Sequence, residues 1–323
     1  MKKITERVAT APDAEAFQTE IYEIGKSVGL NGKETFGAIY LSLLGKDHGP
    51  KAAWLILSLE KEFIKKRFTE ATTIVASEEK DTHETAHHVT SGDEKIKEIF
   101  SIAPSLKEKF PSLSVGVAVI TGVTIEKTHP DLEKEKQHVL ESLHGLTTEQ
   151  LGMYPEILAY RKLYKAMGID WHSRRPSPEA LLRRVALNKG LYTINTCVDA
   201  YNLVVMKHRV SVGAFDFDTL SFSTELRFAK AGEEILLLGD SERTKYTEKE
   251  IAYFDKNGGF NLDFNYRDSQ ETAVQLDTKN LYVNVDGVYD ISPEKVAEIL
   301  QETCDSIMKY CGGKLEAFGV ETA

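Results

Sequence analysis

Three amide and carboxylate side chains stand within an otherwise apolar run, residues 194–202: Asn195, Asp199 and Asn202. Asn and Asp are costly inside a buried element unless each finds a hydrogen-bond partner, so several in one run favour a polar cluster built to hold a ligand. A simpler interpretation is that each side chain bonds only nearby backbone groups. The sequence leaves both alternatives open.

A second candidate is the run His83-Glu84-Thr85-Ala86-His87, which has the H-E-x-x-H spacing of zinc peptidases. In such a site two histidines one helical turn apart bind zinc, and the glutamate acts as general base. The flanking residues here are charged, no apolar helix face would bury the site, and no third ligand stands out. We therefore expect a solvated linker or surface segment. We expect neither a metal site nor another cofactor.

Capping residues and hydrophobic spacing predict the helices and strands that position Asn195, Asp199 and Asn202. Ser177 and Glu179 are typical of a helix start near residue 178, and Lys189-Gly190 of its end. The β-branched run 114–124 predicts a buried strand. Further helices are expected over 131–143, 154–167 and 293–309, and short strands over 225–228, 234–238, 250–254, 260–266, 273–276 and 281–285. This segregation of helices from strands predicts an α+β fold.

The N-terminal part has only helical patterns, over 14–24, 33–44, 51–58 and 61–68, with breaks at the Gly-containing stretches 25–32 and 45–50. We therefore expect a small all-helical domain over residues 1–75, a linker over 76–93 and the α+β domain over 94–323. Four basic side chains gather in the last of these helices: Lys61, Lys65, Lys66 and Arg67. They form either a solvated helix face or a nucleic-acid contact.

Composition sets limits on function. The chain has 323 residues, 41% of them hydrophobic and 28% charged, with a net charge of -10. Residues 1–70 hold 11 Lys and Arg against 10 Asp and Glu, and the remainder holds 29 against 40. This balance argues against binding nucleic acid by bulk charge and against a DNA partner. No stretch is apolar enough to span a bilayer, and three cysteines without CxxC spacing favour a reducing cytoplasm.

A resemblance emerges in the N-terminal part. The run 38–50, which includes Gly45-Lys46-Asp47-His48-Gly49-Pro50, is followed by the apolar helix 54–57. Together they resemble the C-terminal helical region of class I lysyl-tRNA synthetases, which belongs to the anticodon-binding part of those enzymes. Neither of the catalytic signatures of class I synthetases, HIGH and KMSKS, is present. The resemblance therefore implies a tRNA-facing domain and not an aminoacylating enzyme.

The larger part resembles the B3/B4 editing domain of the phenylalanyl-tRNA synthetase β-chain. The matching motifs are Val198-Asp199-Ala200-Tyr201-Asn202, Gly213-Ala214-Phe215-Asp216-Phe217-Asp218, Arg227 with Ala231-Gly232-Glu233, and Asp277-Thr278. The resemblance implies that fold and hydrolysis of the ester between a wrong amino acid and the tRNA 3′ end. Such a pocket has to orient the amino acid, the adenosine and one water.

Carried over residue by residue, the resemblance makes Asn202 and Arg267 the expected catalytic pair, sharing a shallow chamber lined by amides. Gly213 stands where the synthetase has a histidine, and Asn284 where it has an acidic residue. Residues 264–267 replace a Gly-rich stretch, so the amino acid is not expected to be tyrosine. The expected substrate-binding residues are Asn195, Asp199, Tyr201, Gly213, Phe264, Asn265, Asp268 and Asn284.

Two functions follow from this resemblance. The first is a trans-editing hydrolase that acts on misacylated tRNA, with Lys61, Lys65, Lys66 and Arg67 contacting the tRNA. The alternative is a tRNA-binding or amino-acid-binding protein that has lost catalysis together with the histidine at position 213. A zinc peptidase is the third and least favoured possibility. The partners expected are the aminoacylated 3′ end of tRNA and its amino acid moiety, without a membrane.

Overall fold

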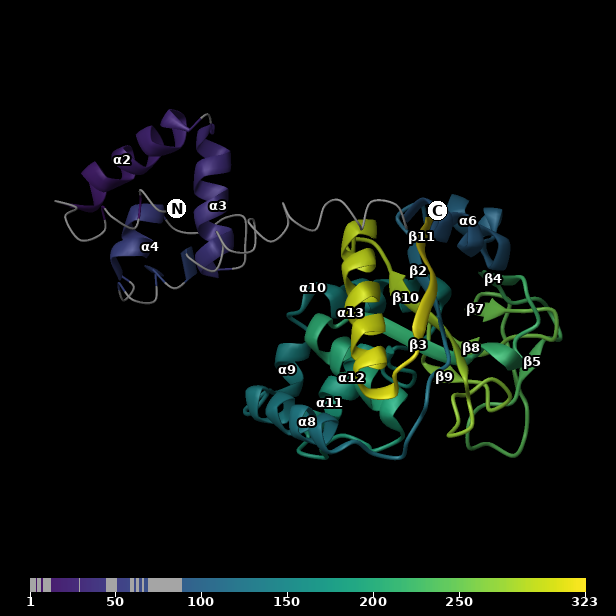
Figure 1. Cartoon of the computed structure of the whole chain (residues 1–323). Helices are drawn as coiled ribbons and strands as arrows, with labels where there is room; N and C mark the ends of the chain where they lie inside the picture. Colours follow the sequence, from purple (N-terminus) through teal and green to yellow (C-terminus); the bar gives the residue numbers. More distant parts are fainter. Residues whose placement is uncertain are drawn as a thin grey trace. The chain divides into compact units, whose positions relative to one another are not determined.

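The computed structural model describes residues 4, 7, 13–28, 30–44, 51–58, 61, 64–65, 67–68 and 89–323. The chain divides into two compact units, residues 1–87 and 88–323 (Figure 1). Among the described residues, no helix has both the length and the apolar character needed to cross a membrane.

The first unit contains the helices α2 (Ala14–Ser27), α3 (Gly32–Leu44) and α4 (Ala52–Ser58). Asp13 caps α2, because its Oδ1 accepts hydrogen bonds from the backbone N–H groups of Glu15 and Ala16 at 2.9 and 2.8 Å. The expected break at Gly25 is wrong. Gly25 lies inside α2, where a Cβ atom would come within 1.9 Å of Thr35 Oγ1, so this glycine allows α2 and α3 to pack closely.

A separate apolar core holds the first unit together. Its members are apolar residues of the helices and of the neighbouring described positions: Ile4, Phe17, Ile21, Ile39, Leu43, Ala52, Ala53, Ile56, Ile64 and Phe68. Their helical spacing buries one stripe of each helix. The Gly-Lys-x-x-Gly-Pro turn at 45–50 lies outside the described residues.

The second unit is organised on a four-stranded antiparallel sheet in the order β11-β2-β10-β3. Its strands are β2 (Ser114–Thr121), β3 (Ser211–Asp216), β10 (Asn280–Gly287) and β11 (Lys314–Thr322). Seven of the eight residues of β2 are buried, which is why its sequence is apolar without alternation. The expected buried strand is thus confirmed.

Helix α13 (Pro293–Cys311) packs on β2 and β10, with α12 (Thr196–His208) beside it (Figure 1). Gly116 of β2 permits this approach, since a Cβ atom there would lie 3.0 Å from Val296 of α13. The other helices are α6 (Val89–Ile99), α7 (Pro104–Lys109), α8 (Pro130–Ser142), α9 (Thr148–Leu151), α10 (Pro155–Met167), α11 (Ser177–Ala186) and the 3-10 turn η1 (Phe217–Thr219).

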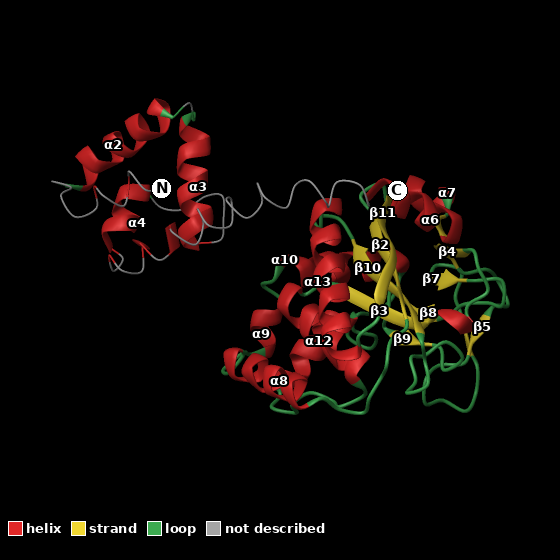
Figure 2. Cartoon of the chain, viewed as in Figure 1, coloured by secondary structure: helices red, strands yellow, loops and turns green. Residues whose placement is uncertain are grey.

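Short strands form three smaller sheets, and Figure 2 shows them apart from helices α8 to α13. β1 (Phe100–Ile102) is parallel to β4 (Thr224–Phe228), which is antiparallel to β7 (Ile251–Phe254). β5 (Glu234–Ile235) pairs with β6 (Thr244–Lys245), and β8 (Asn261–Leu262) pairs with β9 (Arg267–Asp268). This segregation of helices and strands confirms the predicted α+β class.

Two expected strands are wrong. Residues 273–276 contribute only one bridge, between Phe215 and Ala273. In the stretch 260–266 only β8 forms, because Asp263, Phe264 and Asn265 adopt positive φ angles of 50°, 53° and 58°. Three consecutive non-glycine residues in this region cannot continue a strand.

Candidate functional site

The second unit contains a buried polar cluster where β3 and β10 face the turn after β8. In the β3–β10 register Gly213 stands opposite Asn284, and Ser211 stands opposite Asp286. Asn265 of the turn reaches both strands through its side-chain amide, which donates to Asp286 Oδ2 at 2.9 Å and to Ser211 Oγ at 3.4 Å. The structure therefore brings together Gly213, Asn265 and Asn284 from separate elements.

Asp286 is the centre of this cluster and is fully buried. Its carboxylate accepts hydrogen bonds from the Tyr253 hydroxyl and from Asn284 Nδ2 at 3.0 Å, in addition to Asn265. Burial raises the pKa of Asp286 to about 7, and these donors oppose the rise. Asn261 completes the network by donating to Asn265 Oδ1 at 2.6 Å.

An ion-pair network with two buried carboxylates and a partly exposed arginine holds the turn. The Arg174 guanidinium bridges Glu250 and Asp263, with 3.0 Å between Nη1 and Asp263 Oδ2. Burial, with a smaller contribution from Glu250, raises the pKa of Asp263 to about 7. The backbone carbonyls of Asp263 and Phe264 accept hydrogen bonds from Tyr164 and Ser211.

The cluster leaves no room for an amino acid at Gly213. A Cβ atom there would lie 2.6 Å from Asn284 Oδ1 and 2.7 Å from Asn265 Oδ1, and Phe264 is buried beside them. The expected chamber at these residues is therefore wrong, since their own side chains fill it. Asn284 Oδ1 is buried without a hydrogen-bond partner, because it faces the glycine backbone.

The helix residues Asn195, Asp199 and Asn202 serve different purposes. Asn195 caps α12, with Oδ1 accepting from Val198 N at 2.9 Å and Nδ2 donating to Val274 O at 3.2 Å. The cap on Val198 agrees with the simpler interpretation given above, whereas the bond to Val274 reaches a backbone group 79 residues away. Asp199 is buried and pairs with Lys136 Nζ at 2.7 Å.

Asn202 lies one turn further along α12 than Asp199. Together with Lys136, Asp199 and Tyr192 it lines a cavity of about 10 Å³, which is close to the lower limit for one water molecule. An amino acid is far too large for this space.

Arg267 does not face Asn202. It pairs with Asp240, with 2.9 and 3.0 Å between the guanidinium and carboxylate atoms, and donates to Leu238 O at 2.6 Å. It is not among the residues that line the Asn202 cavity. The expectation that these two residues share a chamber is therefore wrong, while their catalytic roles remain predictions.

Asp268 and Tyr201 both lie in poorly solvated surroundings. Asp268 Oδ1 is enclosed without a hydrogen-bond partner, and burial, aided by Asp286, raises the pKa of this carboxyl to about 7. Tyr201 is buried on α12, and burial raises the pKa of its phenol well above the usual value. Nothing in these surroundings assigns either residue to an amino acid substrate.

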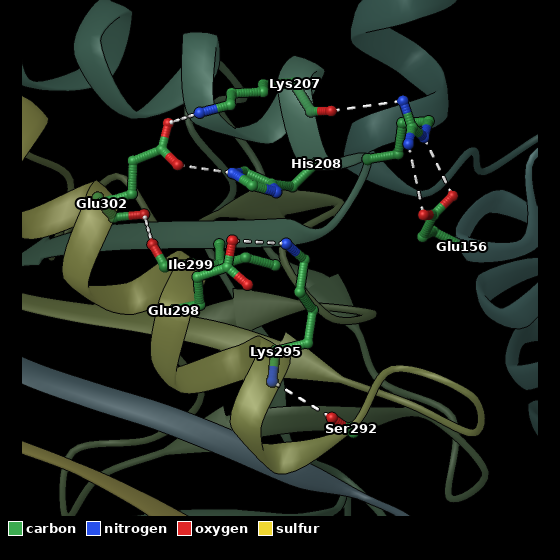
Figure 3. Close-up of polar contacts among 10 residues, drawn as sticks. Glu156, Lys207, His208, Ser292, Lys295, Glu298, Ile299 and Glu302 are labelled. Carbon is green, nitrogen blue, oxygen red and sulfur yellow. Dashed lines mark hydrogen bonds and ion pairs between the residues drawn. The ribbon is translucent and has the colours of Figure 1, made fainter. Parts of the chain in front are cut away.

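A larger cleft of about 480 Å³ lies between α8, α12 and α13. Figure 3 shows Lys207 and His208 facing Glu302, with 2.6 Å from Lys207 Nζ and 2.8 Å from His208 Nε2 to the carboxylate. The cations that line the cleft, Lys207, Arg209 and Lys309, each pair with a carboxylate. This cleft therefore has no uncompensated cation that would select an anionic ligand.

The N-terminal candidates are only partly described. Lys61 and Lys65 are exposed, and Arg67 donates from Nε to Ser42 O at 3.1 Å, which satisfies a carbonyl near the end of α3. Lys66 and the run from His83 to His87 lie outside the described residues. The described residues hold no group of histidine, cysteine and carboxylate side chains suited to a metal ion.

The sequence analysis did not name Asp286 or Tyr253 as site residues, although Asp286 could have been identified from the sequence. In a strand, residues two apart share a face, so a candidate at Asn284 implies a neighbour at Asp286. Tyr253 had no such signal, because it reaches the cluster from another sheet.

Residues 159–312 match the family model of the B3/4 domain. The lysine–tRNA ligase of Methanosphaera stadtmanae is 36% identical over 73 residues, which cover 21% of this chain and 14% of that protein. The phenylalanine–tRNA ligase β subunit of Coxiella burnetii is 37% identical over 92 residues, which cover 28% of this chain and 11% of that protein. The chain thus spans about a seventh or less of the length of these curated relatives.

Among solved structures, the chain is similar to an N-terminal fragment of the phenylalanyl-tRNA synthetase β subunit from Pyrococcus horikoshii. The TM-score is 0.37 and the sequence identity 16%, over 67% of this chain and 50% of that one. The family model and the sequence relatives confirm the two resemblances inferred from the motifs. Residues 159–312 of this chain thus match the B3/4 domain, and part of the chain is related in sequence to the β subunit of phenylalanyl-tRNA synthetase.

Proposed function

We propose that this chain is a tRNA-binding protein assembled from two synthetase-related units. The observation that carries the proposal is that its relatives include both a lysine–tRNA ligase and a phenylalanine–tRNA ligase subunit. The names of those two proteins differ in the amino acid and share the tRNA. We therefore expect both parts of the chain to bind transfer RNA.

The filled cluster at Gly213 supports binding without hydrolysis in that pocket. The side chains of Asn265 and Asn284 occupy the space that a Cβ atom at Gly213 would need. Asn202 lines a cavity that holds about one water molecule, and Arg267 is paired with Asp240. Hydrolysis requires the ester and a water held together near orienting groups. In this arrangement the proposed role of the B3/4 domain is to contact tRNA.

The second candidate is a trans-editing hydrolase that cleaves misacylated tRNA. It is favoured by the relationship to the phenylalanyl enzyme and by the carboxyls of Asp268 and Asp286, whose pKa values are both raised to about 7. A carboxyl that titrates near neutral pH can act as general base toward water. For this candidate the turn 263–265 has to move away from Gly213.

Binding is tested by fluorescence anisotropy of labelled tRNA with the full chain over a series of salt concentrations. We expect binding that weakens as salt rises, because protein cations displace counterions from phosphates. Replacing Lys61 and Lys65 with Gln is expected to reduce this salt dependence, since both are exposed on the helical unit. Absence of tRNA binding by the unaltered chain contradicts the proposal.

Hydrolysis is tested with a panel of misacylated tRNAs. Binding without deacylation of any of them is the expected result. Deacylation that is lost in Asn202→Ala and Arg267→Ala would instead establish the hydrolase. The controls are Asn280→Ala, which removes an amide bound to Asp218, and Arg243→Ala, which removes a guanidinium paired with Glu271 as Arg267 is paired with Asp240.

A further inference from the structure

Helix α11 carries, outside its buried face, two half-buried arginines that differ from the others of the second unit. Within residues 89–323, Arg183 and Arg184 have no carboxylate within ion-pair distance, whereas the other seven arginines each pair with one. Residues 172–192 contain five Lys and Arg and one carboxylate, Glu179. Glu179 is buried and bound by Arg161, so it does not neutralise this surface.

Helical spacing places both arginines outside the buried face of α11, where each is half-buried. The buried face of α11 is formed by Pro178, Glu179, Leu182 and Val185. Arg183 and Arg184 follow on the opposite side, next to the exposed Leu187. Arg183, Arg184 and Lys189 thus place positive charge beside α11, in a chain whose net charge is -10. One carboxylate lies near enough to be affected: hydrogen bonds and, to a smaller degree, Arg183 lower the pKa of Glu149 on α9.

An aromatic ring accompanies this charge. Tyr192 is 56% exposed, and the Arg184 guanidinium lies over its ring, 3.5 Å from the centroid. Arg184 also donates from Nη1 to the Tyr192 hydroxyl at 2.6 Å and from Nη2 to Lys189 O at 3.2 Å. These bonds hold the ring in a fixed position beside the cationic side chains.

We infer that Arg183, Arg184, Lys189 and Tyr192 form a binding surface for single-stranded RNA, here called the α11 surface, and that its ligand is the single-stranded 3′ end of tRNA. Unpaired guanidinium and ammonium groups bind phosphates, and an exposed ring held by an arginine stacks on an unpaired base. A duplex offers no free base face to such a ring, so a single strand fits better. The inference rests on the proposed function, because that proposal supplies the tRNA.

The neighbouring cavity supports this placement. Tyr192 and Leu191 line the same small space as Asn202, so the α11 surface adjoins the residue that the B3/4 resemblance marks for the aminoacyl end. A 3′ end stacked on Tyr192 would lie next to that position on α12.

The experiment measures tRNA binding by the full chain, with intact tRNA and with tRNA whose 3′ single-stranded end has been removed. Tyr192→Ala is expected to weaken binding of intact tRNA about tenfold and to leave binding of the shortened tRNA unchanged. Tyr192→Phe keeps the ring and is expected to bind like the unaltered chain. Arg183→Gln, which breaks no hydrogen bond or ion pair within residues 89–323, is expected to lower the salt slope by about one.

Arg243→Gln is the control for loss of one arginine charge, because Arg243 is more exposed than Arg183 and pairs with Glu271. If the unaltered chain binds tRNA and Tyr192→Ala and Arg183→Gln bind it equally well, the α11 surface is refuted and the proposed function stands. If the unaltered chain does not bind tRNA, both fail. Binding of vesicles with anionic lipids that depends on Arg183 and Tyr192, without such dependence for tRNA, also overturns the inference.

Discussion

The Asp286 cluster and the α11 surface belong to the same unit, and both are rich in groups that can hold a ligand. In the cluster, amide, hydroxyl and carboxylate groups bond mostly to one another, and a glycine is covered by two amides. On the α11 surface two guanidinium groups have no carboxylate within ion-pair distance, and a tyrosine ring is exposed to solvent. The comparison teaches that dense polarity marks a structural network as readily as a site, and that groups left unpaired are the better guide to a ligand.

Breaking the ionic group under the cluster should have the largest effect. Arg174→Met leaves the buried carboxylates of Glu250 and Asp263 without their shared cation. We expect the free energy of unfolding to fall by about 3–5 kcal/mol, measured by urea denaturation. Arg183→Met on the α11 surface is the control and should change it by less than about 0.5 kcal/mol. Similar losses in both variants would contradict the distinction between the two regions.

Gly213→Ala tests whether the cluster is filled. The added methyl group meets Asn284 and Asn265 at 2.6–2.7 Å, so we expect a loss of about 1–3 kcal/mol in unfolding free energy. Asn265→Gly in the same chain should make the effect of Gly213→Ala smaller than it is alone, which a double-mutant cycle measures. A neutral Gly213→Ala would indicate open space at the predicted chamber.

The pH dependence of stability sharpens the comparison further. Burial raises the pKa of Asp286 from its ordinary value of 3.8 to about 7. The folded protein therefore binds the proton of the Asp286 carboxyl more tightly than the unfolded chain does. The stabilisation that this proton gives is complete below about pH 4 and is lost as pH rises through about 7. The melting temperature of the unaltered chain minus that of Asp286→Asn should therefore fall between pH 4 and pH 7.5. A constant difference would contradict the raised pKa.

The smallest effect on unfolding free energy is expected for a solvent-exposed ion pair. Arg243 Nη2 lies 2.6 Å from Glu271 Oε1, and the two side chains are 45% and 52% exposed. Arg243→Gln should lower the unfolding free energy by about 0.2–1 kcal/mol in a denaturation curve. A loss as large as that of Arg174→Met would mean that pairing, rather than burial, decides the energetics.

Sequence reasoning succeeded where local signals agree with tertiary structure. Pro155, Gly168 and the apolar stripe between them define α10, and the β-branched run at 114–121 defines β2. The motifs at 198–202 and 213–218 also identified the B3/4 domain. These features depend on residues close together in the chain.

The predicted shared chamber failed where distant elements meet, while the roles predicted for its residues stay predictions. Positive φ angles at Asp263, Phe264 and Asn265 are not encoded by glycine, so nothing in the sequence indicated a turn that fills the space at Gly213. Arg267 was free to pair with any nearby carboxylate, and only the fold selects Asp240. Which polar side chains satisfy one another is settled by tertiary contacts that residue type and spacing do not specify.

The strand order has a consequence for synthesis on the ribosome. β2 ends at residue 121, but its two partners are β10 and β11, which begin at residues 280 and 314. The emerging chain must carry a continuous apolar strand without its neighbours until most of the remaining protein has been translated. Such late pairing is slow and leaves strand edges open to aggregation, so nascent chains of this protein should depend on chaperones during translation.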